Sequence, residues 1–290
     1  MSEPKTAAFI GLGVMGYPMA GHLQAKGFAT RVYNRSGAKA EAWVAQHGGT
    51  SAPTPRAAAE GADIVFCCVG NDQDLEQVTL GDEGAFHGLK QGGVFVDHTT
   101  ASADIARRLD AAAKEMGFGF LDAPVSGGQA GAENGVLTII GRARLKSSSA
   151  PRPMMEAFGR AVTLIGPAGA GQLAKMVNQI CIAGLLQGLS EALSFADKAG
   201  LDAKLVLDVI SKGAAQSWQM ENRGTTMVDD TFDFGFAVDW MRKDLGICMA
   251  EANRIGAPLP VTALVDQFYK DVQGLGGGRW DTSSLIKRLK

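Results

Sequence analysis

A glycine-rich loop between an apolar strand and a helix constrains the fold of this chain most. The loop Gly11-Leu-Gly-Val-Met-Gly16 follows the apolar stretch Ala7–Ile10 and opens the helical pattern of Met15–Lys26. In this setting the first glycine permits a tight turn, the second lets the backbone approach a pyrophosphate, and the third lets the helix pack closely on the strand. The free N–H groups of the helix then face the phosphates. The sequence therefore predicts dinucleotide binding by Gly11, Leu12, Gly13, Val14, Met15 and Gly16.

The first half of the chain alternates short apolar stretches with helical patterns, which predicts a parallel, doubly wound sheet. After Gly166-Pro167 almost every stretch is helical. We therefore predict an α/β fold in which a Rossmann domain at residues 1–166 is joined by a long helix to an all-α domain at residues 167–290. The expected strands are Ala7–Ile10, Thr30–Tyr33, Ile64–Val69, Val94–Asp97, Gly119–Leu121, Leu137–Ile140 and Ala161–Ile165. The expected helices are Met15–Lys26, Ala38–His47, Ala103–Met116, Gln172–Ala199, Ala203–Ser211, Val238–Arg254 and Pro260–Gln273. Ser102 and Asp202 are the expected N-caps of the helices that follow them.

Composition and charge exclude several classes of protein. A hydrophobic content of 46% and a charged content of 20% are typical of a globular protein. The formal net charge of −2 argues against nucleic-acid and membrane-surface partners, which require a basic face. No stretch reaches the ~18–20 uninterrupted apolar residues of a membrane span, and the short polar N-terminus does not fit a signal peptide. We therefore expect a cytoplasmic protein, with structural thiols and no metal site because no Cys-x-x-Cys or His/Cys/Asp/Glu cluster has ligand spacing.

The residues after the second expected strand bear on the choice of cofactor. An NAD site usually has an Asp or Glu about 20 residues after the glycines, where it binds the ribose 2′-OH. This chain has Asn34-Arg35-Ser36 at that point. Arg35 can bind a 2′-phosphate through two charge-assisted hydrogen bonds, whereas a carboxylate would repel it. The sequence therefore favours NADP(H), with NAD(H) as the alternative, unless Arg35 is only a solvated loop residue.

A lysine and an asparagine lie near the start of the long helix. Lys175 and Asn178 are three residues apart, with Gln172 one turn earlier. Side chains at this spacing share a helix face, so an ammonium and an amide point to one spot. Lysine is rarely buried without a partner. Lys175 is therefore either a functional group or a side chain that extends to solvent from the helix edge.

A second loop has the composition of an anion-binding turn. Ser126-Gly127-Gly128 follows the strand Gly119–Leu121 and exposes consecutive backbone N–H groups beside a hydroxyl. Such a concave backbone suits a carboxylate, although a plain turn has the same composition. Thr99-Thr100 ends the preceding strand and is expected near the nicotinamide ribose.

These motifs together resemble those of the β-hydroxyacid dehydrogenases, which include 3-hydroxyisobutyrate dehydrogenase, tartronate semialdehyde reductase and the glyoxylate/succinic semialdehyde reductases. The resemblance extends from Lys5 to about Leu285. The four blocks that carry it are Gly11–Gly16, Asp122–Gly128, Gly171–Asn178 and Lys243–Leu245.

The resemblance implies an NADP(H)-dependent oxidoreductase that transfers hydride between the cofactor and a small β-hydroxy acid or its semialdehyde. Lys175 would be the catalytic acid/base, Asn178 would orient the substrate, and Asp244 would help to set the geometry of the site. Ser126, Gly127 and Gly128 would bind the substrate carboxylate, and Phe236 would line the pocket. Asn34, Arg35, Ser36, Val69, Thr100 and Lys243 would contact the cofactor.

Two rival interpretations share this fold. Imine reductases typically replace the family lysine with Asp or Tyr, and non-catalytic relatives have lost it, so Lys175 opposes both. The length excludes full 6-phosphogluconate dehydrogenases, which have a much longer helical domain. The apolar surface of the helical domain is expected to be buried in a homodimer or homotetramer.

One segment and the four histidines do not belong to the predicted site. Gly141–Pro153 is basic and rich in Ser and Pro, where relatives usually have a Gly-Gly-Asp turn and a regular helix, and its composition indicates a surface excursion or a local divergence. His22, His47 and His87 are expected at the surface, whereas His98 adjoins the Thr99-Thr100 turn and could have a secondary role.

Overall fold

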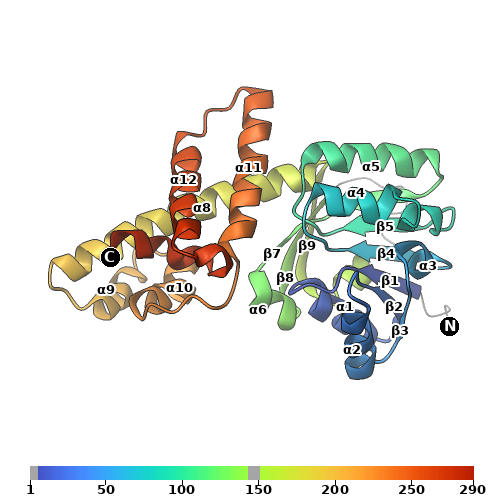
Figure 1. Cartoon of the computed structure of the whole chain (residues 1–290), viewed down its shortest axis with the longest axis horizontal. Coiled ribbons are helices and arrows are strands. Elements are labelled where there is room, and N and C mark those ends of the chain that lie inside the picture. Colours follow the sequence, from blue (N-terminus) through green and yellow to red (C-terminus); the bar gives the residue numbers. More distant parts are fainter. Residues whose placement is uncertain (1–5, 143–150) are drawn as a thin grey trace. The chain divides into compact units, whose positions relative to one another are not determined.

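The computed structural model of the chain describes residues 6–142 and 151–290 (Figure 1). The chain divides into two compact units, Met1–Lys175 and Met176–Lys290. The boundary lies within one continuous helix, α8 (Ala170–Lys198), so the first turns of this helix belong to the first unit. The boundary predicted from the sequence, between residues 166 and 167, coincides with the end of the last strand, at Gly166.

The first unit is built on a parallel sheet of six strands in the order β3-β2-β1-β4-β5-β6. Strands β2 and β3 are added on one side of β1, and strands β4, β5 and β6 are added on its other side. The direction in which the chain adds strands therefore reverses between β3 and β4. In open α/β sheets, ligands bind outside the carboxyl ends of the strands at such a switch point. The strands are β1 (Thr6–Ile10), β2 (Ala29–Tyr33), β3 (Thr50–Ser51), β4 (Ile64–Cys67), β5 (Val94–Asp97) and β6 (Gly119–Asp122). This sheet confirms the predicted doubly wound fold.

Both faces of the six-stranded sheet are covered by helices, because its strands are apolar on both sides. Phe9, Phe66 and Val96 face one hydrophobic cluster, and their neighbours Ile10, Val65 and Phe95 face the other. Helices α1 and α2 lie on one side of the sheet and α3, α4 and α5 on the other (Figure 1). Their bounds are α1 (Gly16–Ala25), α2 (Gly37–His47), α3 (Pro55–Ala59), α4 (Asp72–Leu80) and α5 (Ala103–Glu115), with a 3-10 turn η1 (Ala85–His87).

Side chains at the helix starts explain several of these boundaries. Ser102 accepts a hydrogen bond from the Ile105 N–H at 3.1 Å, as expected for the predicted N-cap of α5. Asn71 and Thr54 cap α4 and α3 in the same way. Helices α3 and α4 were not expected from the sequence, because α3 is short and α4 has only a weak apolar stripe.

The two further predicted strands, Leu137–Ile140 and Ala161–Ile165, are confirmed as strands, and they belong to a second, smaller sheet. These segments form β8 (Leu137–Arg142) and β9 (Gly159–Gly166), which pair in parallel with each other. The two-residue strand β7 (Val125–Ser126) pairs antiparallel with β8. The chain turns out of the main sheet after Asp122, because Pro124 cannot donate to a strand ladder.

Two short helices flank this sheet, α6 (Gly128–Glu133) and α7 (Arg152–Met155). The basic segment predicted to depart from the family pattern falls mostly on 143–150, outside the described residues. Its end is α7, which has Pro153 in the first turn, where a missing N–H has little effect.

The second unit contains only helices. It consists of the remainder of α8, α9 (Ala203–Ile210), α10 (Trp218–Val228), α11 (Val238–Ile255) and α12 (Pro260–Gly274), with 3-10 segments η2 (Gly277–Arg279) and η3 (Thr282–Leu289). Leu186 packs in a cluster with α11 and α12, and Leu193 packs in a cluster with α9 and α10. The Asp202 side chain accepts from the N–H groups of Lys204 and Leu205, which confirms it as the cap of α9.

Helix α8 is long and apolar. Among the described residues it alone has the length and mean hydropathy of a membrane-crossing helix, 1.2 over an 18-residue window that is 44% buried. The sequence criterion of uninterrupted apolar residues missed it because polar side chains such as Lys175 and Gln187 break the run. Leu186, Leu189 and Leu193 pack in the core of the second unit, and core helices pass the same test.

The second unit also leaves apolar side chains in contact with water. Phe195 at the end of α8 is 73% exposed, and Leu205 and Val209 on α9 are each 61% exposed. Such surface is typical of association sites. The homo-oligomer expected from the sequence stays a prediction.

Candidate functional site

The glycine loop has the geometry that its sequence predicts. Gly11 adopts a left-handed backbone with φ +94°, and a Cβ there would lie 2.3 Å from the Cys68 carbonyl oxygen. A Cβ on Gly16 would lie 1.9 Å from the Gly11 carbonyl oxygen, so only glycine lets α1 start this close to β1. At Gly13 an added Cβ would meet no atom within 4 Å, which leaves open space in front of the loop. No side chain caps the start of α1, so this helix end suits a pyrophosphate, although the Tyr17 N–H already donates to the Gly13 carbonyl at 3.0 Å and Pro18 has no N–H.

Asn34 and Arg35 follow β2 beside this loop. The Asn34 side-chain oxygen accepts a hydrogen bond from the Leu12 N–H at 3.0 Å, so the asparagine holds the glycine loop itself. The Arg35 side chain is 88% exposed and forms an ion pair with Asp74 on α4 at 3.4 Å. An exposed pair of this kind contributes little to stability. The Arg35 guanidinium is therefore accessible to an anion that can displace Asp74.

Val69 and Thr99 join the ends of β4 and β5. The Val69 N–H donates to the Thr99 hydroxyl at 3.1 Å, and the Thr99 N–H donates to Asp97 at 2.9 Å. Asp97 is fully buried, and burial raises the pKa of its carboxyl to about 7. Thr100, the predicted cofactor contact, is half-buried immediately after this turn.

Ser126, Gly127 and Gly128 lie at the junction of β7 and α6. Both glycines are exposed and have positive φ, +134° and +61°, which brings the backbone round in a turn that other residues adopt with strain. Nothing lies within 4 Å of a Cβ placed on Gly128. The turn is thus open to a ligand, and its role as a carboxylate site stays a prediction.

Lys175 lies in the first unit and is only 8% exposed. This burial excludes the alternative of a side chain extending freely into solvent. One turn earlier, Gln172 is fully buried and bonded to the backbone of Thr99 and Ala101. Lys175 therefore follows directly after the part of α8 that is attached to the carboxyl edge of the sheet.

The second unit brings three other predicted residues into one network. The Asn178 amide donates to the Gln179 oxygen at 2.8 Å, and the Gln179 amide donates to Asp244 at 2.6 Å. Asp244 also pairs with the Lys243 ammonium at 3.0 Å, and both Asp244 and Gln179 are 2% exposed. Gln179 links the predicted substrate contact to the predicted Lys-Asp motif.

Asp122 and Gln179 were missed as site residues in the sequence, and Gln172 was noted there without a role. The available signal was the presence of polar side chains in apolar surroundings: Asp122 ends a buried strand, and both glutamines interrupt an apolar helix. Buried polar groups need partners, so each such residue indicates a specific contact.

The aromatic residues of the second unit have mostly structural positions. Phe236 is half-buried and packs against the α8, α11 and α12 cluster, while its N–H donates to Asp281 at 2.9 Å. Phe232 is buried in the other cluster. Trp218 and Phe234 each stack on the Arg223 guanidinium at 5.0 Å, and Trp240 lies 5.9 Å from the Lys243 ammonium.

The histidines only partly match expectation. His87 is exposed as predicted, but His22 and His47 are half-buried, because His22 bonds to the carbonyls of Ala132 and Glu133 at the end of α6. His98 is buried beside Phe66 and Phe158, and its Nδ1 donates to the Ala123 carbonyl at 2.6 Å. Burial lowers the pKa of His98 to about 4, so it is a neutral core residue at pH 7.

The thiols lie in different surroundings. Cys67 and Cys248 are buried, Cys68 is half-buried and Cys181 is exposed. Burial, reinforced by Asp244, raises the pKa of Cys248 to about 12, and burial raises that of Cys67 well above its ordinary value. Neither buried thiol is a nucleophile at neutral pH.

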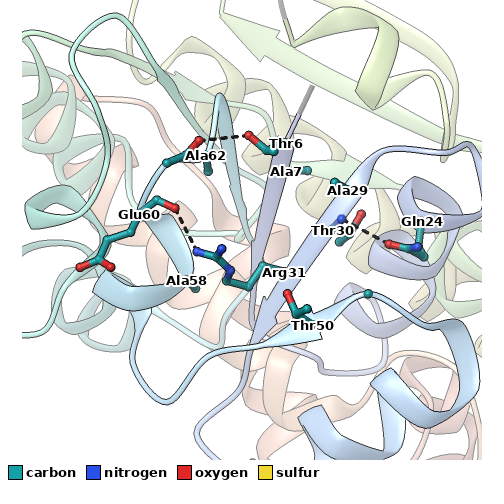
Figure 2. Close-up of a pocket in the computed structure, with 12 residues that line it drawn as sticks. Thr6, Ala7, Gln24, Ala29, Thr30, Arg31, Thr50, Ala58, Glu60 and Ala62 are labelled. Atoms are coloured by element: carbon teal, nitrogen blue, oxygen red, sulfur yellow. Dashed lines mark hydrogen bonds between the residues drawn. The ribbon is translucent and has the colours of Figure 1, made fainter. Parts of the chain in front are cut away.

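A cavity of about 350 Å³ lies at the opposite, amino edge of the six-stranded sheet. Figure 2 shows Arg31 directed toward the Glu60 carbonyl and Thr30 toward Gln24. The Arg31 guanidinium donates to the carbonyls of Ala57 and Glu60 at 3.0 and 2.9 Å, so its Nη1 is already used within the fold. This cavity is separate from the glycine loop, which follows the carboxyl end of β1.

Comparison with known proteins agrees with this arrangement. A family model described as the NAD binding domain of 6-phosphogluconate dehydrogenase matches residues 6–166. A second, described as NAD-binding of NADP-dependent 3-hydroxyisobutyrate dehydrogenase, matches residues 169–289. The chain belongs to the β-hydroxyacid dehydrogenase family. It is therefore a member of a family of NAD(P)-dependent oxidoreductases.

Individual relatives cover nearly the whole chain. An oxidoreductase of Shewanella frigidimarina is 62% identical over 283 residues, which cover 98% of this chain and 97% of the relative. The 2-hydroxy-3-oxopropionate reductase of Escherichia coli is 34% identical over 282 residues, 97% and 96% of the two chains. The structure of Psf3 in complex with NADP+ and 2-OPP has a TM-score of 0.89 at 27% identity and covers 98% of this chain and 100% of its own.

An imine reductase, the activity of the rival interpretation, is also among the structurally similar proteins. An imine reductase from Myxococcus stipitatus has a TM-score of 0.65 at 19% identity and covers 99% of each chain. At this identity the likeness shows a shared fold alone.

The raised pKa of Asp97 predicts a pH-dependent stability. In the folded state the Asp97 carboxyl keeps its proton up to a pH of about 7, whereas in the unfolded state it loses the proton near pH 3.8. The protonated carboxyl therefore contributes its full stabilisation below pH 3.8, and this stabilisation is lost as the pH rises through 7. Asp97→Asn removes the titration. The free energy of unfolding of the variant, relative to wild type, should therefore rise by about 1.4 kcal/mol per pH unit between pH 5 and 7, roughly 3 kcal/mol in all.

Urea titrations of the full chain at several pH values measure this difference. Asp104→Asn is the matched control, because the Asp104 side chain is 65% exposed and its surface ion pair with Arg107 contributes little to stability. Comparing each variant with wild type also cancels the opposite contribution of His98, which adds stability as the pH rises from 4 to 6.5. An Asp97→Asn difference that stays constant from pH 5 to 8 would contradict the assignment.

Proposed function

We propose that the protein is an NADP(H)-dependent reductase and dehydrogenase that interconverts small β-hydroxy acids and their semialdehydes, with Lys175 as the acid/base. The observation that carries the proposal is the position of Lys175. It is a buried lysine on a helix whose first turn is hydrogen-bonded to the carboxyl edge of the sheet, the edge at which the glycine loop lies. A buried lysine at such a place is suited to proton transfer rather than to packing.

When bound at the glycine loop, NADPH supplies the hydride. In the reductive direction the Lys175 ammonium gives its proton to the substrate oxygen, and its positive charge stabilises the oxygen as negative charge develops there. In the oxidative direction the neutral amine accepts the hydroxyl proton. Ser126, Gly127 and Gly128 bind the substrate carboxylate through the hydroxyl and backbone N–H groups, and Asn178 binds the substrate from the next turn of α8. This division of roles is what the family resemblance implies.

The preference for NADP(H) is supported by charge. The three residues directly after β2, Asn34 to Ser36, include no carboxylate, and the exposed Arg35 can exchange Asp74 for a 2′-phosphate. The family model that matches residues 169–289 is likewise that of an NADP-dependent enzyme.

Lys175→Ala tests the acid/base role. We expect kcat for reduction to fall by about 10²–10⁴-fold, the usual contribution of a positioned acid. The Kd for NADPH should stay within about twofold of wild type, because the lysine acts on the substrate oxygen. Steady-state NADPH oxidation gives kcat, and nucleotide fluorescence gives the Kd.

The control is Lys198→Ala, which removes an exposed lysine from the other end of the same helix. Turnover is measured with glyoxylate, succinic semialdehyde and tartronate semialdehyde, and a cyclic imine is included to test the rival activity. Near-normal turnover of Lys175→Ala on the semialdehydes, or turnover of the imine alone, is incompatible with the proposal.

Arg35→Ala tests the cofactor preference. We expect kcat/KM for NADPH to fall by about 10-fold or more while the value for NADH changes little, since the loss of a charge-assisted pair with phosphate amounts to about 1.5–3 kcal/mol. Asp74→Asn should act in the opposite direction and improve kcat/KM for NADPH, because it removes a competing carboxylate. Lys26→Ala, which removes an exposed cation after α1, is the control. Equal loss with both cofactors in Arg35→Ala would refute the role of Arg35.

A further inference from the structure

The start of α8 is attached to β6 by a carboxylate. One oxygen of Asp122 accepts a hydrogen bond from the Gly169 N–H at 3.1 Å, and the other accepts from the Gln172 N–H at 3.2 Å. Asp122 is the last residue of β6 and is fully buried. The N–H groups of a first helical turn have no partner within their own helix. Asp122 thus caps α8 from a strand that is distant in sequence.

Gln172 makes a second attachment, through its side chain. Its Nε2 donates to the Thr99 carbonyl at 2.7 Å, and its Oε1 accepts from the Ala101 N–H at 3.0 Å. The primary amide therefore pairs with two backbone groups of the segment that follows β5, as a neighbouring strand would. Because the side chain is fully buried, the loss of either bond would leave a polar group without water.

Gly171 makes these two attachments possible. A Cβ at this position would lie 2.7 Å from the carbonyl oxygens of both Asp122 and Ile140. The helix therefore approaches the backbone of β6 and β8 more closely than a residue with a side chain would allow. The combination of a close approach and two sets of hydrogen bonds leaves α8 little freedom to slide or rotate at its start.

Thr99 connects this attachment to the expected cofactor side. Its carbonyl receives the Gln172 amide, while its hydroxyl receives the N–H of Val69, the residue predicted to contact the cofactor. One short segment thus holds both the turn after β4 and the start of α8.

Lys175 lies three residues after Gln172 on the same face of α8. A helix rises 1.5 Å and turns about 100° per residue, so a small shift of the first turn moves the amine by a comparable distance. A misplacement of about 1 Å can lower a rate by about 10²-fold.

We propose that Asp122 and Gln172 are positioning residues, which hold the start of α8 against the sheet and thereby fix where the Lys175 amine meets the substrate. The inference rests on the proposed acid/base role of Lys175. It adds two residues whose contribution is made through Lys175 and not through contact with substrate.

The experiment uses the full chain with Gln172→Met, which keeps the size of the side chain and removes both hydrogen bonds. We expect kcat to fall by about 10–100-fold at saturating substrate, with the Kd for NADPH within about twofold of wild type. Asp122→Asn, which keeps one acceptor, should give a smaller fall of the same kind. Hydrogen exchange should become faster at the amides of 170–178 in both variants, a readout that does not depend on turnover.

Gln187→Met is the matched control. Gln187 is also buried on α8, but its amide donates to Glu191 within the helix and not to the sheet. This variant should keep kcat and leave exchange at 170–178 unchanged.

A double variant separates positioning from general structural damage. If Gln172 acts through Lys175, Gln172→Met in the Lys175→Ala background should lower kcat less than about threefold further. Independent losses that multiply would overturn the inference, as would a kcat for Gln172→Met within about threefold of wild type. If Gln172→Met does not fold, the same cycle is carried out with Asp122→Asn. If Lys175→Ala itself turns over normally, the proposed function fails, whereas faster exchange at 170–178 would still show that the attachment holds the helix.

Discussion

The meeting of the α8 N-terminus with the carboxyl edge of the sheet is the contact on which the rest of the site depends. The Asp122 carboxylate lies at the N-terminus of α8, where the helix dipole favours negative charge, and it accepts hydrogen bonds from two backbone N–H groups there. Its burial raises the pKa of the carboxyl, and the hydrogen bonds from Gly169 and Gln172 act in the opposite direction. A buried carboxylate of this kind is tolerated only when its acceptors are used, so the contact specifies one arrangement of helix and strand.

The topology explains why functional residues from distant parts of the sequence gather at this edge. Parallel strands all end on the same side, and the reversal of strand order between β1 and β4 leaves space there for a ligand. The glycine loop follows β1, Val69 follows β4 closely, Thr100 follows β5, and Asp122 ends β6. The amino edge carries a cavity of its own, but the Arg31 Nη1 there is bonded to backbone carbonyls and serves the fold.

The doubly wound sheet and the helical second half could be predicted because they depend on local pattern. Alternating apolar strands and helices specify a doubly wound sheet, and the cap residues Ser102 and Asp202 mark their helices correctly. The second sheet could not be predicted. Whether β8 pairs with the main sheet or with β7 and β9 depends on the path of the chain after β6, at Pro124. That path is determined by tertiary contacts and not by local sequence. The same holds for Gln172 and Gln179. Their partners are backbone groups of Thr99 and Ala101 in one case and a side chain 65 residues away in the other, and no spacing along the chain identifies these.

The central claim is that the Lys175 amine is the proton donor, and rescue by added amines tests it most directly. In Lys175→Ala, methylamine or ethylamine should restore a substantial part of kcat, in a saturable manner and with a rate that rises with the concentration of the ammonium form. The same amines should leave the wild type and Arg35→Ala unchanged. An undiminished rate in Lys175→Ala without amine, or a low rate that no small amine raises, would contradict the account.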